Sequence, residues 1–153
     1  MTDFNWRPGI TERDGRIGTS ANTVAPGKRM LSSQSPTLVA KDGKLVLVTG
    51  SPGGRTIPNT VLSVVLGVTS FGLDVRQAVD APRLHHQWLP DRVSFEGAED
   101  PRHATALDRL RGWGHDIGAK ASRQGDAHSI MIVGDKLFGA ADARRTIGKA
   151  AGY

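Results

Sequence analysis

Two short segments of this chain could present backbone N–H groups and hydroxyls to an anion. Residues 31–36 read LSSQSP, and residues 49–55 read TGSPGGR. Gly53 and Gly54 lack a Cβ, so their amides can approach a ligand closely and adopt positive φ, whereas Pro52 has a fixed φ and no N–H. A paired-glycine bend just ahead of a helix is how proteins build oxyanion holes and anion cradles. The same string also occurs as a plain strand-to-helix turn, so by itself it leaves both interpretations open.

The sequence around the glycine pair predicts a strand before it and a helix after it. Residues 37–40 and 45–49 are apolar runs separated by KDGK, and an Asp-Gly pair between such runs is typical of a β-hairpin. Because the runs are continuously apolar, we expect these strands to be buried on both faces. Residues 57–71 are apolar at helical intervals, with Pro58 in the first turn, and predict a helix.

The remaining elements alternate without a repeat. A short helix is expected at 74–79, with Asp74 as its N-cap, and an amphipathic helix at 101–112. We expect strands at 93–95 and 115–119, and a second hairpin from 129–133 and 136–139. Residues 1–30 have few large aliphatic side chains and no periodicity, which favours a mostly extended loop. The order hairpin, helices, hairpin indicates one layered α+β domain, with no separate second domain.

Composition excludes several classes of function. The 153 residues suit one domain, and the absence of cysteine excludes disulfides and thiolate chemistry. The net charge of +5 comes from scattered arginines, with no run of five like charges, so we expect no nucleic-acid partner. No stretch approaches the roughly 18 apolar residues of a membrane span, and no secretory leader opens the chain. His85 and His86 are adjacent, so their side chains diverge, and we expect neither a metal nor a cofactor.

Several strings, in order, carry a resemblance to a known family. They are DF at 3–4, PG at 8–9, PGKRMLSSQSP at 26–36, GSPGG at 50–54, AVDAPRLHHQWLPD at 78–91 and AAGY at 150–153. Together they resemble the C-terminal part of the small subunit of gamma-glutamyltransferases (gamma-glutamyltranspeptidases), which are N-terminal-nucleophile (Ntn) hydrolases. The resemblance covers essentially the whole chain. It implies an α+β fold that forms part of a four-layer αββα sandwich, to which this segment supplies inner strands and one helical layer.

The resemblance also implies roles for five residues. Asp3 matches the aspartate that binds the α-ammonium group of the γ-glutamyl substrate, which requires a charged acceptor in a dry pocket. Ser32 and Ser33 match the serine pair that hydrogen-bonds the substrate α-carboxylate. Gly53 and Gly54 match the glycines whose amides stabilise the tetrahedral oxyanion, in agreement with the reading of the bend itself.

The departures from the family concern the nucleophile. In the family it is a threonine freed at the N-terminus of the small subunit by autocatalytic cleavage, with its own α-amino group as base. That threonine and the large subunit would lie before Met1, so the resemblance implies a fragment that is inactive alone. Removal of Met1 would expose Thr2, but Thr2 stands in the substrate-binding segment rather than at the nucleophile's position.

The implied activity belongs to the complete enzyme. It would cleave γ-glutamyl amides such as glutathione through a γ-glutamyl-threonine ester and transfer the acyl group to water, amino acids or peptides. The alternative is a catalytically inert truncated homologue or a glutamate-binding remnant. Expected partners are the large subunit and the N-terminal part of the small subunit, or a second copy through self-association. Bacterial relatives are usually exported, which would place the protein in the periplasm or outside the cell.

The remaining polar and aromatic residues are expected to be structural. We expect His115 and His128 to be surface or hydrogen-bonded residues rather than acid–base catalysts, and Arg144 and Arg145 to be a solvated pair. The three tryptophans are expected in the core or an interface; they are Trp6, Trp88 and Trp113.

Overall fold

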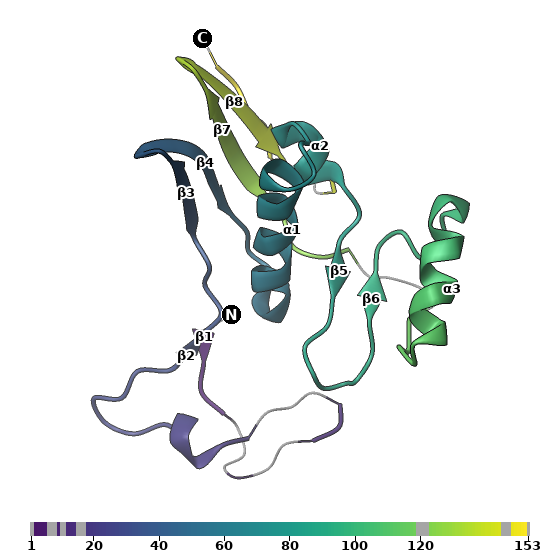
Figure 1. The fold of residues 1–153 in the computed structure, drawn as a ribbon. Coiled ribbons are helices and arrows are strands. Elements are labelled where there is room, and N and C mark those ends of the chain that lie inside the picture. Colours follow the sequence, from purple (N-terminus) through teal and green to yellow (C-terminus); the bar gives the residue numbers. More distant parts are fainter. Residues whose placement is uncertain are drawn as a thin grey trace.

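The largest sheet of the molecule is four-stranded and antiparallel (Figure 1). The computed structural model describes residues 2–5, 9, 12–14, 18–118, 123–144 and 148–152. The strands stand in the order β3-β4-β7-β8, with bounds β3 (Thr37–Lys41), β4 (Lys44–Gly50), β7 (His128–Val133) and β8 (Lys136–Ala141). Pairing of β4 with β7 joins the two hairpins, so residues far apart in the chain meet, as Thr49 does with Ser129.

Both predicted hairpins are confirmed. In the first, Asp42 and Gly43 have φ of 52° and 74°, the pair of left-handed conformations that a tight two-residue hairpin turn requires. The second hairpin connects β7 and β8 around Gly134 and Asp135 and pairs Val133 with Lys136. The residues of the two turns therefore determine which strands pair within each hairpin.

Two helices cover one face of this sheet (Figure 1). Helix α1 (Ile57–Thr69) follows a short 3-10 turn, η2 (Gly54–Thr56), and has Pro58 in its first turn, as predicted. Helix α2 (Val75–Asp80) begins at the predicted N-cap. The Asp74 carboxylate accepts from the Gln77 N–H at 2.8 Å, and the Gln77 side chain accepts from the Asp74 N–H at 3.1 Å. This reciprocal capping box satisfies two N-terminal donors.

Only one face of the sheet is buried. Leu47 on β4 and Val64 on α1 are fully buried in the core between sheet and helices. On the opposite face, Leu38 is 71% and Ile130 43% exposed, and both are in register with Val48. The expectation of strands buried on both faces is therefore wrong for the described chain, because no described element covers this apolar face.

A second, smaller cluster lies beside the sheet domain. Its elements are β5 (Leu84–His85), β6 (Ser94–Phe95), η3 (Pro101–His103) and α3 (Ala104–Gly112). Val93, Leu107 and Ile117 form its buried centre. The predicted strand at 115–119 is wrong over its described residues, because Ile117 makes only an isolated parallel bridge to Val93. The helix predicted at 101–112 is confirmed as η3 followed by α3.

The described residues of the N-terminal segment form three short elements, β1 (Thr2–Asp3), η1 (Ser20–Asn22) and β2 (Leu31–Ser32). Trp88 and Trp113 are 66% and 70% exposed, so neither is a core residue, while Trp6 lies outside the described residues. No described helix combines the length and the apolar character needed to cross a membrane.

The contrast between the two faces of the sheet can be measured. We expect Leu47→Ala to lower the free energy of unfolding by roughly 2–5 kcal/mol, because it leaves a cavity in the packed core. Leu38→Ala is the matched control, since its side chain is mostly exposed. Denaturant unfolding of the purified chain measures both. Equal losses for the two variants would contradict the one-sided core.

Candidate functional site

A strand pair brings the backbones of two predicted substrate-binding residues close together. In the β1–β2 register, Thr2 is opposite Ser32 and Asp3 is opposite Leu31, so the backbones of Asp3 and Ser32 are neighbours. Asn22 holds this arrangement in place. Its amide oxygen accepts from the Leu31 N–H at 3.0 Å, and its amide nitrogen donates to the Asn5 side chain at 3.0 Å. The side chain of Asp3 lies outside what the structure describes.

A direct hydrogen bond connects the serine pair to the glycine pair. The Ser33 hydroxyl donates to the Gly54 carbonyl at 2.8 Å. A hydroxyl can donate only one hydrogen bond. To donate to a bound carboxylate, Ser33 would therefore have to give up its hydrogen bond to the Gly54 carbonyl. The Ser32 hydroxyl oxygen accepts from the Gln34 N–H at 3.2 Å.

The glycine bend contains two backbone N–H groups, those of Gly53 and Gly54, that donate no hydrogen bond to a described residue. Gly53 has φ 145° and ψ 8°, and Gly54 has φ 61°, conformations that favour glycine. Within the part of the chain that the structure describes, neither amide donates a hydrogen bond. The Gly53 carbonyl instead accepts from the Thr56 N–H at 3.2 Å and from the Thr56 hydroxyl at 2.9 Å. Two adjacent N–H groups ahead of a helix can hold an anion or an oxyanion.

The predicted site residues thus come from three places in the chain and meet in one region. Ser33 touches Gly54 directly, and the β1–β2 pairing brings Asp3 to the serine pair. The chemistry that these groups offer is the binding of a carboxylate and the stabilisation of negative charge on oxygen.

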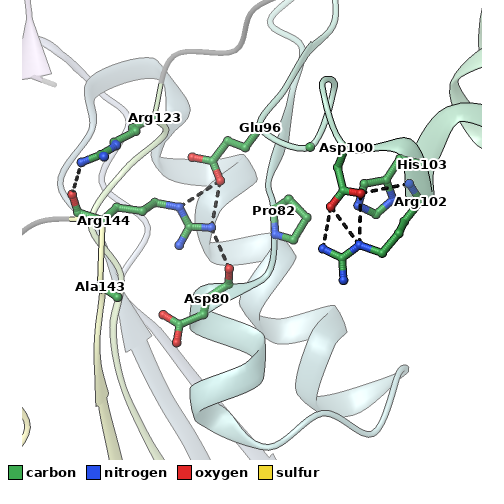
Figure 2. A pocket seen from close by; sticks show the side chains of 10 residues that line it. Asp80, Pro82, Glu96, Asp100, Arg102, His103, Arg123, Ala143 and Arg144 are labelled. Carbon is green, nitrogen blue, oxygen red and sulfur yellow. Dashed lines mark hydrogen bonds and ion pairs between the residues drawn. The ribbon is translucent and has the colours of Figure 1, made fainter.

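Sequence reasoning missed a buried ion network close behind the bend. The guanidinium of Arg83 lies 2.7 Å from the Asp142 carboxylate, and both side chains are fully buried. Arg144 reaches Glu96 at 2.8 Å and Asp142 at 3.1 Å, and it also bonds the Asp80 carbonyl at 3.1 Å (Figure 2). The prediction of a solvated pair is therefore wrong for Arg144, because its side chain is only 13% exposed and all its partners except Asp142 lie on distant segments; Arg145 is outside the described residues. No local pattern around these charges could have revealed the pairing.

The network fixes the charge of its central carboxylate. Burial by itself would raise the pKa of Asp142. The hydrogen bonds from the Arg144 and Ala127 N–H groups and from the Arg83 side chain outweigh burial and lower this pKa to about 2. Asp142 is therefore ionised throughout the physiological pH range.

The charged cavity beside this network is separate from the predicted site. Its volume is about 500 Å³, and its walls include Asp80, Glu96, Asp100, Arg102 and Arg144 (Figure 2). Four of its charged side chains form ion pairs, Arg144 with Glu96 and Arg102 with Asp100 at 2.5 Å. No predicted site residue lines it.

The adjacent histidines face different partners. His85 Nε2 lies 2.9 Å from the Gln87 side chain, and His86 Nε2 lies 3.0 Å from Asp91. Among the described residues, no group of three His, Asp or Glu side chains is placed to hold a metal ion. His128 is exposed, with a side-chain exposure of 50%.

Comparisons with known proteins give a consistent result. A sequence model of the gamma-glutamyltranspeptidase family matches residues 1–153. The chain is 46% identical to a glutathione hydrolase proenzyme of Escherichia coli over all of its own length, and 38% identical to one of Pseudomonas aeruginosa over 94% of it. A solved Helicobacter pylori gamma-glutamyltranspeptidase superposes with a TM-score of 0.83 at 38% identity, covering 93% of this chain and 77% of that one. The chain spans about a quarter of the length of the two curated relatives, 26% in each.

The buried ion pair makes stability depend on pH in a defined direction. The pKa of Asp142 is lower in the folded protein than the roughly 3.9 of an unfolded aspartate, so its stabilisation is present above about pH 4 and is lost as pH falls toward 2. We expect Asp142→Asn to reduce the free energy of unfolding at pH 7 by roughly 3–5 kcal/mol, because Arg83 keeps a buried charge without a countercharge at this distance.

Denaturant unfolding of both proteins between pH 7 and pH 2 tests this expectation. The gap between wild type and Asp142→Asn should narrow as the pH falls below 4. Asp108→Asn serves as the control, because Asp108 forms an exposed pair with Arg111 and should change stability little. A gap that stays constant down to pH 2 would contradict the role given to the Asp142 charge.

Proposed function

The chain belongs to the gamma-glutamyltranspeptidase family, and we propose that it forms the substrate-binding and oxyanion-binding part of an enzyme that cleaves γ-glutamyl amides such as glutathione. One observation carries the proposal. Within the described chain, two adjacent glycine amides at the start of a helix have no acceptor, and the Gly54 carbonyl accepts a hydrogen bond from Ser33 of the serine pair. An amide substrate held at both its charged end and its developing oxyanion needs this combination.

Each residue then has a separate task. The Asp3 carboxylate accepts the substrate α-ammonium group, and Ser32 and Ser33 bind its α-carboxylate. The Gly53 and Gly54 amides donate to the oxygen of the γ-carbonyl when it becomes negative. The β1–β2 register and the Ser33–Gly54 bond support this division, because they bring the residues into one region.

The reaction requires a nucleophile from outside these residues. In the proposed enzyme, a threonine hydroxyl attacks the γ-carbonyl while its own α-amino group takes the proton. The C–N bond then breaks, the amine leaves with a proton, and water or an acceptor amine resolves the γ-glutamyl ester. We place this threonine in the part of the enzyme that corresponds to the three-quarters of the relatives' length not spanned by the present chain.

The exposed apolar face of the sheet supports a partner within the same enzyme. Leu38, Ile130 and Leu137 are 71%, 43% and 72% exposed on strands β3, β7 and β8. A sheet face with several exposed large apolar side chains is typical of an interface, because contiguous apolar patches on soluble proteins mark interaction sites. We assign it to the remaining layers of an αββα sandwich, supplied by the rest of the enzyme.

Steady-state hydrolysis of a γ-glutamyl anilide by the full-length protein that carries this segment tests the roles. We expect Gly53→Ala to lower kcat by roughly 10²- to 10³-fold, since a Cβ there would stand 2.6 Å from the Thr56 hydroxyl and displace the amide. Ser32→Ala should instead raise KM by roughly 10-fold, through loss of a hydrogen bond to a charged group.

The control for these variants is Gly112→Ala, because a Cβ at Gly112 meets nothing within 4 Å. Unchanged kcat in Gly53→Ala would contradict the oxyanion role. A wild-type protein that binds glutamate in calorimetry but releases no aniline would favour a glutamate-binding remnant.

A charge on the apolar sheet face tests the proposed partner. We expect Ile130→Asp to prevent co-elution of this segment with the remainder of the processed enzyme in size-exclusion chromatography, because a buried unpaired carboxylate is strongly unfavourable. Thr105→Asp, at an exposed position on α3, is the charge-matched control. Normal assembly of the Ile130→Asp protein would show that the face is not an interface.

A further inference from the structure

The two glycine amides of the bend are each oriented by a side-chain hydroxyl. A peptide unit is planar and trans, so its C=O and N–H point in opposite directions. The N–H of Gly53 shares a peptide unit with the Pro52 carbonyl, and the N–H of Gly54 shares one with the Gly53 carbonyl. A group that holds either carbonyl therefore sets the direction of the following amide.

Both carbonyls are held. The Ser51 hydroxyl donates to the Pro52 carbonyl at 2.6 Å. The Thr56 hydroxyl donates to the Gly53 carbonyl at 2.9 Å, beside the Thr56 N–H at 3.2 Å. Each N–H of the pair consequently points away from the hydroxyl that holds its carbonyl, and neither N–H has an acceptor in the described chain.

Ser51 is itself anchored by the segment 124–127, which packs behind the bend. Its hydroxyl oxygen accepts from the Asp126 N–H at 2.9 Å. Gly125 has φ 67°, and a Cβ there would stand 2.7 Å from the Ser51 hydroxyl and 2.6 Å from the Thr60 hydroxyl. The Cα of Gly125 also lies 3.1 Å from the position of a Cβ on Gly53. Glycine at both positions lets the two backbones approach this closely.

The ends of that segment are fixed by the buried ion pair. Arg83 donates to the Gln124 carbonyl at 2.6 Å, and the Ala127 N–H donates to Asp142 at 2.9 Å. The Asp126 N–H is therefore held in place from both sides, and it holds the Ser51 oxygen in turn.

We propose that Ser51 and Thr56 are positioning residues of the oxyanion hole, each fixing the direction of one glycine N–H through the carbonyl of the same peptide unit. This inference rests on the proposed function of the bend. Neither hydroxyl contacts the substrate in this arrangement. Loss of either should weaken transition-state stabilisation while substrate binding at Asp3 and the serine pair is retained.

The test compares Ser51→Ala and Thr56→Val with matched controls in the full-length protein that carries this segment. Ser63→Ala and Thr69→Val also remove one hydroxyl-to-carbonyl bond each, both at 2.8 Å within α1. We expect kcat for a γ-glutamyl anilide to fall roughly 10- to 100-fold in the first pair, less than for loss of a donor, with KM nearly unchanged. The controls should stay near wild type, and Ser51→Thr and Thr56→Ser should restore most of the rate.

Affinity for a tetrahedral boronate analogue of the γ-glutamyl group separates positioning from general destabilisation. Its inhibition constant should rise by the factor by which kcat/KM falls, because the boronate oxygen uses the same two amides. Crystal structures of the two variants give a readout that is independent of activity. We expect the 52–53 peptide plane in Ser51→Ala and the 53–54 plane in Thr56→Val to rotate or to adopt more than one orientation.

The outcomes distinguish this inference from the proposed function. Unchanged peptide planes in both variants would overturn the positioning role, whatever the kinetics. Unchanged kcat in both variants of an active enzyme would overturn it as well. A wild-type protein without hydrolytic activity would instead refute the proposed function, and rotation of the planes would still decide whether the two hydroxyls orient the amides.

Discussion

The buried ion pair between Arg83 and Asp142 is the interaction on which the rest of this structure depends. Removing two charges from water is unfavourable, and it is offset only when further hydrogen bonds satisfy both groups. Here Asp142 accepts from two backbone N–H groups, and Arg83 donates to the carbonyls of Val79 and Gln124. The pair thereby ties together the end of α2, the end of β8 and the segment before β7. Of these, the segment before β7 packs against the glycine bend, where the Asp126 N–H donates to the Ser51 hydroxyl.

The consequence for function is a site made largely of backbone. The groups that would bind an oxyanion are two N–H groups, and backbone donors can be aimed only by holding the peptide units that carry them. Hydroxyls of Ser51 and Thr56 hold the two carbonyls concerned, and the ion pair holds the segment that anchors Ser51. A preorganised donor needs no reorientation when charge develops, which is the main advantage of such a site.

The two faces of the four-stranded sheet differ in what covers them. One face forms the core with α1 and α2, whereas the other remains apolar and exposed. The chain also spans only about a quarter of the length of its curated relatives, 26% of each. A half-covered sheet is what a segment of a layered enzyme should present, and it explains why continuous apolar runs occur in strands that this chain buries on one side only.

The amino-acid sequence by itself determined the parts of this protein that depend on neighbouring residues. Asp42 and Gly43 specify a hairpin turn, Asp74 and Gln77 cap a helix, and the glycine pair follows a strand, because turn and cap chemistry acts over a few residues. The order of the sequence motifs likewise indicated the family without a structure. Only the tertiary structure decided that Arg144 is held rather than solvated, that no described element covers one sheet face, and that Asp126 meets Ser51. Those contacts depend on the pairing of β4 with β7 and on where distant loops end, and no periodicity or local propensity encodes them.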